Sequence, residues 1–328
     1  RNAAKMNVSA ETSRFNMTIF DAYVNLLRTQ TESMSAAIAG VDEITVTPFD
    51  ATYEQPTEFS ERIARNQQLL LKEEAHFDKV VDPAAGSYYL ENLTASIAAE
   101  AWKQFLAIQE QGGMYAMVMD GKVQEHMQAN LNTRLADVAK RKEVLLGSNQ
   151  FPNFTEKAGK KIKLEGKTCG CQGACEPQLP ILPIARAAEQ FEQLRLETEG
   201  AKKQPVAFML TIGNLAMRIA RAQFSCNFLA CAGYKVIDNN GFATVAEGIK
   251  AARKAKADII VLCSSDDEYA TLAPQAWKKL QNAKETFIVA GAPACMADLQ
   301  ALGIQNFINV RSNVLETLKS LNQQLLKK

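Results

Sequence analysis

Histidine is almost absent from this sequence of 328 residues, which contains only two of them. Both lie in the N-terminal half, and the stretch from residue 206 to residue 326 has none. Imidazole is the commonest protein ligand of transition metals and the usual acid or base near neutral pH. The C-terminal part of the chain therefore has no histidine of its own for a metal site or an acid–base pair.

An excess of charge of one sign is also missing. The 37 lysines and arginines nearly balance 36 aspartates and glutamates, which leaves a net charge of +1. Such a chain offers no strong electrostatic field to nucleic acid or to a membrane surface. No apolar run approaches the roughly 20 residues of a membrane-spanning helix. We expect a globular protein, 47% hydrophobic and 22% charged, with neither nucleic acid nor membrane among its partners.

Paired cysteines are not evident either, because the chain has seven, an odd number. Three lie in apolar strand or helix patterns: Cys226, Cys231 and Cys263. This usage favours reduced thiols in a cytoplasmic compartment over a disulfide framework. Cys169, Cys171 and Cys175 lie within seven residues and are weak zinc candidates, since structural zinc sites use paired C-x2-C spacings and no fourth ligand is nearby.

Apolar strand patterns alternate with helical patterns in the C-terminal part. Five strand-like runs are separated by helical stretches of ten or more residues: 206–212, 234–238, 258–262, 286–290 and 305–310. This alternation predicts parallel strands joined by right-handed crossovers, here a five-stranded flavodoxin-like α/β sheet. Ligands of such sheets bind at the carboxyl ends of the strands, so the turn at Gly213 is where a ligand is expected.

The same turn resembles the cobalamin-binding domain of the methylmalonyl-CoA mutase family. Members of that family carry Asp-x-His-x-x-Gly here, in which the histidine ligates cobalt, the aspartate supports it and the glycine admits the nucleotide tail. Gly213, Leu215 and Arg218 stand at these three positions. Leucine has no lone pair for a metal, and an aspartate–imidazole pair is meaningless without the imidazole. The resemblance implies a degenerate domain in which these positions are vestigial and bind no cofactor.

The N-terminal half reads as two strands among four helices. The predicted strands are 42–47 and 144–146, and the predicted helices are 18–39, one that follows Thr57, 93–111 and 122–142. Thr57 is the expected N-cap of the second helix. The first helix shows an apolar stripe of Phe20, Val24, Leu27, Met34 and Ile38, and the second shows Phe59, Ile63, Leu70 and Leu71. Both stripes are expected to face a core.

Three stretches resemble the same family more specifically: residues 57–66 (TEFSERIARN), 82–89 (DPAAGSYY) and 186–195 (RAAEQFEQLR). The resemblance implies three parts. Residues 1–147 are the C-terminal portion of a substrate-binding (β/α)8 barrel with a helical segment, 148–180 are a linker, and 181–328 are the cobalamin-binding-like domain. A closed barrel needs about 200 residues or more. We therefore expect a C-terminal piece of a longer protein, in keeping with the first residue, Arg1.

Catalytic residues of the family are replaced in this half as well. Val46 stands where catalytic chains place a substrate-contacting histidine, and Phe15 where they carry an arginine. The resemblance thus implies the small, non-catalytic subunit of a heterodimeric bacterial-type mutase of propionate metabolism. Adenosylcobalamin is expected on the homologous large subunit, which would interconvert methylmalonyl-CoA and succinyl-CoA. In this reading the present chain has no catalytic, cofactor-binding or metal-binding residue.

Two other readings stay open at this point. The chain could bind cobalamin without a protein imidazole and be an acyl-CoA mutase in its own right, although Arg218 in place of the close-approach glycine argues against it. It could also be a small-molecule sensor, for which no ligand is indicated. Asp266, Asp267 and Glu268 follow the third strand, where helix capping explains them best. Arg218, Asp266 and Arg311 are expected to fill the vacated cleft.

Overall fold

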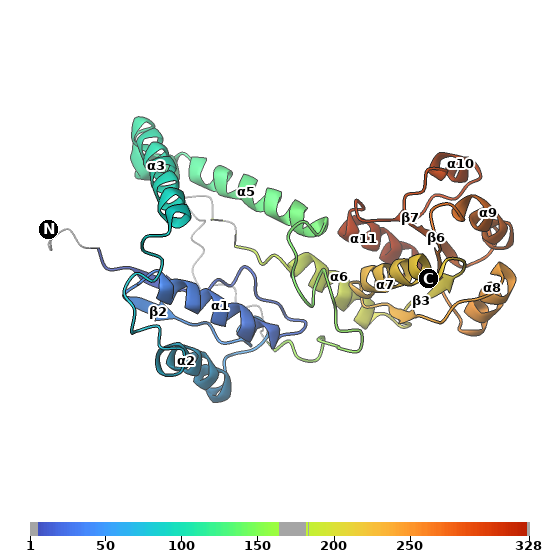
Figure 1. Cartoon of the computed structure of the whole chain (residues 1–328), viewed down its shortest axis with the longest axis horizontal. Helices are drawn as coiled ribbons and strands as arrows, with labels where there is room; N and C mark the ends of the chain where they lie inside the picture. The colour runs from blue at the N-terminus through green and yellow to red at the C-terminus, as the bar shows by residue number, and fades with distance from the viewer. Residues whose placement is uncertain (1–5, 164–181, 183, 327–328) are drawn as a thin grey trace, which may run out of the picture. The chain divides into compact units, whose positions relative to one another are not determined.

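The computed structural model describes residues 6–163, 182 and 184–326, which fall into two compact units (Figure 1). The N-terminal unit lies within Arg1–Ala136 and Lys161–Ala187, and the C-terminal unit within Asp137–Lys160 and Ala188–Lys328. None of the helices in the described ranges is both long and apolar enough to cross a membrane.

The N-terminal unit opens with a β–α–β arrangement. Strand β1 (Ser9–Glu11) pairs in parallel with β2 (Glu43–Thr45), and α1 (Val24–Ile38) connects them. Parallel neighbours joined by a helix are the repeating unit of a (β/α) barrel. The prediction of a strand over 42–47 is confirmed, although the paired part is shorter, while β1 was not foreseen. At three residues it carries too little alternation to be detected.

The predicted strand over 144–146 is wrong. These residues belong to the C-terminal unit and make one isolated bridge, between Leu146 and Gln150. The chain reverses at Gly147, which has φ +81°. The side chain of Asn149 accepts from Leu145 N at 2.7 Å and donates to Glu143 O at 2.9 Å. The side chain of Asn149 thus takes up backbone groups that a strand would offer to a sheet partner.

Helix α2 (Glu58–Glu73) begins as predicted with Thr57. Thr57 Oγ1 accepts from Ser60 N at 3.2 Å, and Ser60 Oγ accepts from Thr57 N at 2.9 Å. This reciprocal pair is a capping box, which satisfies two backbone donors that a helix start leaves free.

The predicted apolar faces of α1 and α2 are largely exposed, contrary to expectation. Leu27 is 66% exposed and Phe59 60% exposed, although Leu71 is buried. The buried face of α1 is instead polar: Asn25, Thr29 and Ser33. Asn25 Nδ2 donates to the carbonyl oxygens of Thr18 (2.8 Å) and Phe49 (3.0 Å). These hydrogen bonds make the burial of the Asn25 amide tolerable.

Three helices follow: α3 (Tyr88–Glu110), α4 (Gly113–Met119) and α5 (Lys122–Ala139). None of the 23 residues of α3 is buried against the described part of the chain. Trp102 and Phe105 stack on its surface with ring centroids 5.2 Å apart. Helix α4 was missed because Gly112 and Gly113 were read as a stop; both have positive φ and redirect the chain between two helices.

The C-terminal unit is a parallel sheet covered by helices (Figure 1). Its strands are β3 (Val206–Thr211), β4 (Lys235–Ile237), β5 (Ile259–Cys263), β6 (Thr286–Ala290) and β7 (Phe307–Ile308). Their order is β4-β3-β5-β6-β7, with all pairs parallel. This is the flavodoxin-like order, in which the first strand lies inside the sheet, so the fold prediction is confirmed.

Six helices accompany the sheet: α6 (Glu189–Gly200), α7 (Leu215–Ala230), α8 (Val245–Lys254), α9 (Tyr269–Leu280), α10 (Met296–Ala301) and α11 (Val314–Leu325). Helices α8, α9 and α10 pack on one face and α7 on the other (Figure 1). Strand β5 (IIVLC) is buried along its whole length, as expected of a parallel strand covered on both faces.

Residues 148–160, predicted as linker, lie against α6 in the C-terminal unit. Arg195 Nη2 donates to the carbonyl oxygens of Asn153 (2.6 Å) and Glu156 (2.8 Å). One turn later along α6, the carboxylate of Glu199 accepts from Ala158 N and Gly159 N, each at 3.0 Å. Charged side chains bonded to backbone groups therefore hold this irregular segment in place.

Candidate functional site at the carboxyl edge of the sheet

Three glycines mark the turns at the carboxyl edge of the five-stranded sheet. Gly213 follows β3 (φ +80°), Gly241 follows β4 (φ +108°) and Gly291 follows β6 (φ +147°). Glycine at such a turn tolerates positive φ and lets another group approach the backbone closely. Each of the three spaces is filled by a side chain of the chain itself.

The space over Gly213 holds the carboxylate of Glu268. A Cβ placed on Gly213 would lie 2.2 Å from Glu268 Oε2. This oxygen accepts from Ser264 Oγ (2.5 Å), Ser265 Oγ (2.7 Å), Ser265 N (3.2 Å) and Asn214 N (3.2 Å). The two serine hydroxyls, followed by the backbone donors, lower the pKa of Glu268 from 4.5 to about 2. One ionised carboxylate thus ties the β3–α7 turn to the β5–α9 turn.

The space over Gly241 holds the guanidinium of Arg218. Its Nη1 donates to Gly213 O at 3.2 Å and its Nη2 to Asn240 O at 2.9 Å. A Cβ on Gly241 would lie 2.7 Å from Arg218 Cζ. Arg218 therefore bridges the turns after β3 and β4. The strand order reverses between β3 and β5, whose turns Glu268 joins. In this fold the crevice for a ligand is expected there.

The space beside Gly291 is bounded by an ion pair. Arg221 Nη2 lies 2.9 Å from Asp266 Oδ1, and a Cβ on Gly291 would be 3.2 Å from that oxygen and 3.3 Å from Arg221 Cζ. Beneath them Tyr269 is fully buried. Its hydroxyl accepts from Ser264 N at 3.1 Å and donates to Ala290 O. Burial raises the pKa of Tyr269, so it stays a neutral hydrogen-bonding group.

The three positions that were predicted to be vestigial lie after β3 and at the start of α7. Gly213 ends the turn after β3, Leu215 is the first residue of α7 and is 60% exposed, and Arg218 lies one turn further along the helix. Asn214 caps α7, since its Oδ1 accepts from Met217 N at 3.1 Å. Within the described ranges no group of three or more histidine, cysteine or acidic side chains could hold a metal ion.

Other predicted residues are dispersed. Val46 is buried just after β2, and the ring of Phe15 lies under Arg134 Cζ, which is 3.9 Å from the ring centroid. Arg311 is exposed in the loop before α11. Cys169, Cys171 and Cys175 lie outside the described residues, so their metal candidacy stays a prediction.

Filling of the cleft by Arg218 and Asp266 was foreseen, but the role of Glu268 was missed. Sequence reasoning assigned this glutamate to helix capping, but its side chain makes no capping hydrogen bond to α9. The available signal was the Ser265-x-x-Glu268 spacing, which is typical of a capping box. Its contact with Asn214, 54 residues away, has no local signature.

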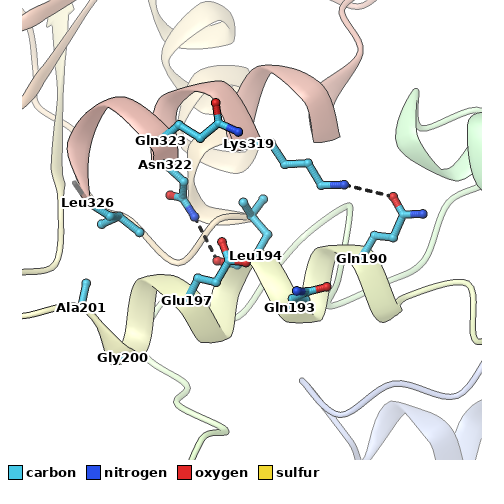
Figure 2. A pocket seen from close by; sticks show the side chains of 10 residues that line it. All are labelled: Gln190, Gln193, Leu194, Glu197, Gly200, Ala201, Lys319, Asn322, Gln323 and Leu326. Carbon is cyan, nitrogen blue, oxygen red and sulfur yellow. Dashed lines mark hydrogen bonds between the residues drawn. The ribbon is translucent and has the colours of Figure 1, made fainter.

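A second concave region lies between α6 and α11 of the C-terminal unit (Figure 2). This groove of about 620 Å³ is lined by amides and charged side chains together with Leu194 and Leu326. Lys319 Nζ donates to Gln190 Oε1 at 3.3 Å, and Asn322 Nδ2 donates to Leu194 O at 3.2 Å (Figure 2). The bonds join two helices, which indicates a structural role for these side chains.

Fold and turns together define a class: an α/β protein whose flavodoxin-like unit is built on the plan of a ligand-binding domain. The sequence profile described as methylmalonyl-CoA mutase matches residues 1–171. The chain belongs to the methylmalonyl-CoA mutase family.

Relatives carry the names of subunits of this enzyme. The methylmalonyl-CoA mutase small subunit of Porphyromonas gingivalis is 61% identical over 323 residues, which are 98% of this chain and 52% of the relative. The small subunit of Streptomyces virginiae is 34% identical over 84% of this chain and 44% of its own length. A probable small subunit of Mycobacterium bovis is 30% identical over 97% and 50%. The chain thus spans about half the length of these curated relatives.

Proposed function

We propose that this chain is part of the small subunit of a cytoplasmic, adenosylcobalamin-dependent methylmalonyl-CoA mutase. In this proposal it contributes no catalytic and no cofactor-binding residue, and it stabilises a homologous large subunit that carries the cofactor and interconverts methylmalonyl-CoA and succinyl-CoA. One observation carries the proposal: the three turn glycines at the expected ligand edge are covered by Glu268, Arg218 and the Arg221–Asp266 pair.

The residues present do not fit the cofactor that the family implies. Leu215 offers no donor atom to cobalt. A second acidic residue at position 213 would place its Cβ against the carboxylate of Glu268, and two like charges at that distance repel each other. Arg218 stands where the family carries the glycine that admits the nucleotide tail, and its guanidinium lies against Gly241. These facts also disfavour the alternative of a chain that binds cobalamin without a protein imidazole.

Exposed apolar surface supports the role of a stabilising partner. Trp102 is 62% exposed, Ile97 61% and Phe105 45%, all on α3. Trp102 and Phe105 stack on each other, and large exposed apolar groups that gather on a surface mark contact sites. The names of the relatives, which describe small subunits, point to another polypeptide of the mutase as the partner. A partner that binds the folded state of this chain and not the unfolded state would raise the stability of the chain by mass action.

The test is a titration of the purified chain with hydroxocobalamin, followed by visible absorbance and gel filtration, alone and with the homologous large subunit. We expect no corrinoid to migrate with the chain alone. We expect a 1:1 complex in which mutase activity is proportional to the amount of corrinoid bound to the large subunit. Stoichiometric corrinoid on the isolated chain would contradict the proposal and favour a mutase active in its own right.

A further inference from the structure

The carboxylate of Glu268 has the surroundings of a bound anion. Its four donors come from two separate turns: Asn214 N at the start of α7, and the hydroxyls of Ser264 and Ser265 with Ser265 N after β5. Ser264 Oγ also lies 2.9 Å from Ile212 O, so its one proton is shared between the two acceptors. Backbone amides and hydroxyls around one oxygen form the kind of concavity that binds phosphate or carboxylate.

The position of this carboxylate matters as much as its bonds. It lies against the backbone of Gly213, in the first strand-to-helix turn of a doubly wound sheet. In such folds the positive end of the following helix favours negative charge. One cation remains nearby if the carboxylate is removed: Arg218, which is bonded to Gly213 O. The emptied space would therefore still attract an anion.

We propose that Glu268 is a built-in occupant of an oxyanion pocket, formed by Asn214 N, Ser264 Oγ, Ser265 Oγ and Ser265 N. By filling this pocket the glutamate excludes any ligand whose phosphate or carboxylate would bind in the first turn. Glu268 is thus the residue that closes the vestigial cleft. The inference rests on the proposed function, because it supplies the means by which the chain keeps a ligand out.

The test compares three variants of the whole chain. Glu268→Ala empties the pocket, whereas Glu268→Gln keeps its volume and an acceptor oxygen without the charge. Asp267→Ala is the matched control, since it removes an exposed neighbouring carboxylate outside the pocket. Each protein is heated in chloride buffer and in inorganic phosphate buffer of equal ionic strength. Amide exchange is followed in peptides that contain Asn214 and Ser265.

We expect a saturable increase of the melting temperature by phosphate for Glu268→Ala alone. Exchange at Asn214 should become about tenfold faster in that variant, because the amide loses a charge-assisted bond, and phosphate should slow it again. Equal responses of Glu268→Ala and Asp267→Ala would overturn the proposal. So would equal phosphate stabilisation of Glu268→Gln and Glu268→Ala, because a filled pocket must exclude the ion.

If Glu268→Ala does not fold, the oxyanion pocket can still be tested with Glu268→Gln. The Glu268→Gln variant must then exchange faster at Asn214 than wild type, while Asp267→Ala must not, and the reverse pattern refutes the pocket. The outcome is separate from that of the corrinoid titration. Corrinoid on the wild-type chain contradicts the proposed function, whereas a phosphate-indifferent Glu268→Ala contradicts only the oxyanion pocket.

Discussion

The hydroxyl of Tyr234 donates a 2.7 Å hydrogen bond to Oδ1 of Asn322, although the two residues are 88 positions apart. Both are buried, at 1% and 4% exposure. Thr198 Oγ1 lies 3.3 Å from the same oxygen. This amide, which lines the groove of Figure 2, therefore joins α6 and α11 to Tyr234, the residue before β4.

Substitution Tyr234→Phe should lower the free energy of unfolding by about 1 kcal/mol, because a buried acceptor loses its shortest donor while the ring stays packed. Urea unfolding followed by circular dichroism measures the difference. Tyr115→Phe is the control, since Tyr115 is 79% exposed. Equal stability of the two variants would mean that the Tyr234–Asn322 bond contributes nothing.

Substitution Gly213→Ala should lower the free energy of unfolding by about 2–3 kcal/mol, which is more than Gly303→Ala should lower it. Both glycines have positive φ, which penalises a side chain by roughly 1–2 kcal/mol. At Gly303 the nearest atom is 3.4 Å from the added Cβ, whereas at Gly213 the methyl displaces the Glu268 carboxylate from its donors. In the double variant with Glu268→Ala this extra cost should disappear. Additive costs would show that the two positions are not coupled.

Low pH should abolish the contribution of Glu268 to the stability of the folded chain. Its pKa is about 2 in the folded chain against 4.5 ordinarily, so the unfolded chain binds the proton more readily between these values. The contribution is complete above about pH 5 and is lost as the pH falls towards 2. The difference in melting temperature between wild type and Glu268→Gln should therefore be larger at pH 6 than at pH 3. A constant difference contradicts this; Asp267→Asn serves as the control.

Thiol labelling should separate the four described cysteines. Cys226, Cys231 and Cys263 are buried, whereas Cys295 is half-buried. Burial raises the pKa of Cys226 to about 12, so at pH 8 it is almost wholly protonated, and the thiolate is the reactive form. In iodoacetamide labelling read by mass spectrometry, we expect Cys295 to react first and the other three only after unfolding. Equal rates for Cys226 and Cys295 would count against this.

Features that depend on local sequence were predicted well. The run IIVLC of β5 reads as a buried strand wherever it lies, because each of its side chains is apolar. The capping box of Thr57 and Ser60 needs only residues three positions apart. The parallel direction of the five strands followed from their alternation with helical patterns and from the right-handed crossover rule.

Features that depend on what covers a surface were predicted poorly. Periodicity showed that Leu27 and Asn25 lie on different faces of α1, but not that the polar face is the one in contact with the rest of the unit. The same limit applied at the site. The leucine at position 215, which has no donor atom for a metal, could be recognised in the sequence, whereas the contact of Glu268 with Asn214 depends on two distant turns meeting.

The chain has only two tryptophans, and each unit contains one of them. Trp277 is half-buried against Phe287, with ring centroids 6.2 Å apart, and its Nε1 donates to Leu302 O at 2.8 Å. Trp102 lies on the exposed surface of α3. Intrinsic fluorescence therefore carries two separate signals: a red shift from Trp277 when the sheet unfolds, and a blue shift from Trp102 when another protein covers α3. Replacing either tryptophan by phenylalanine would leave a protein without added labels whose fluorescence follows only one of the two processes, unfolding of the sheet or binding at α3.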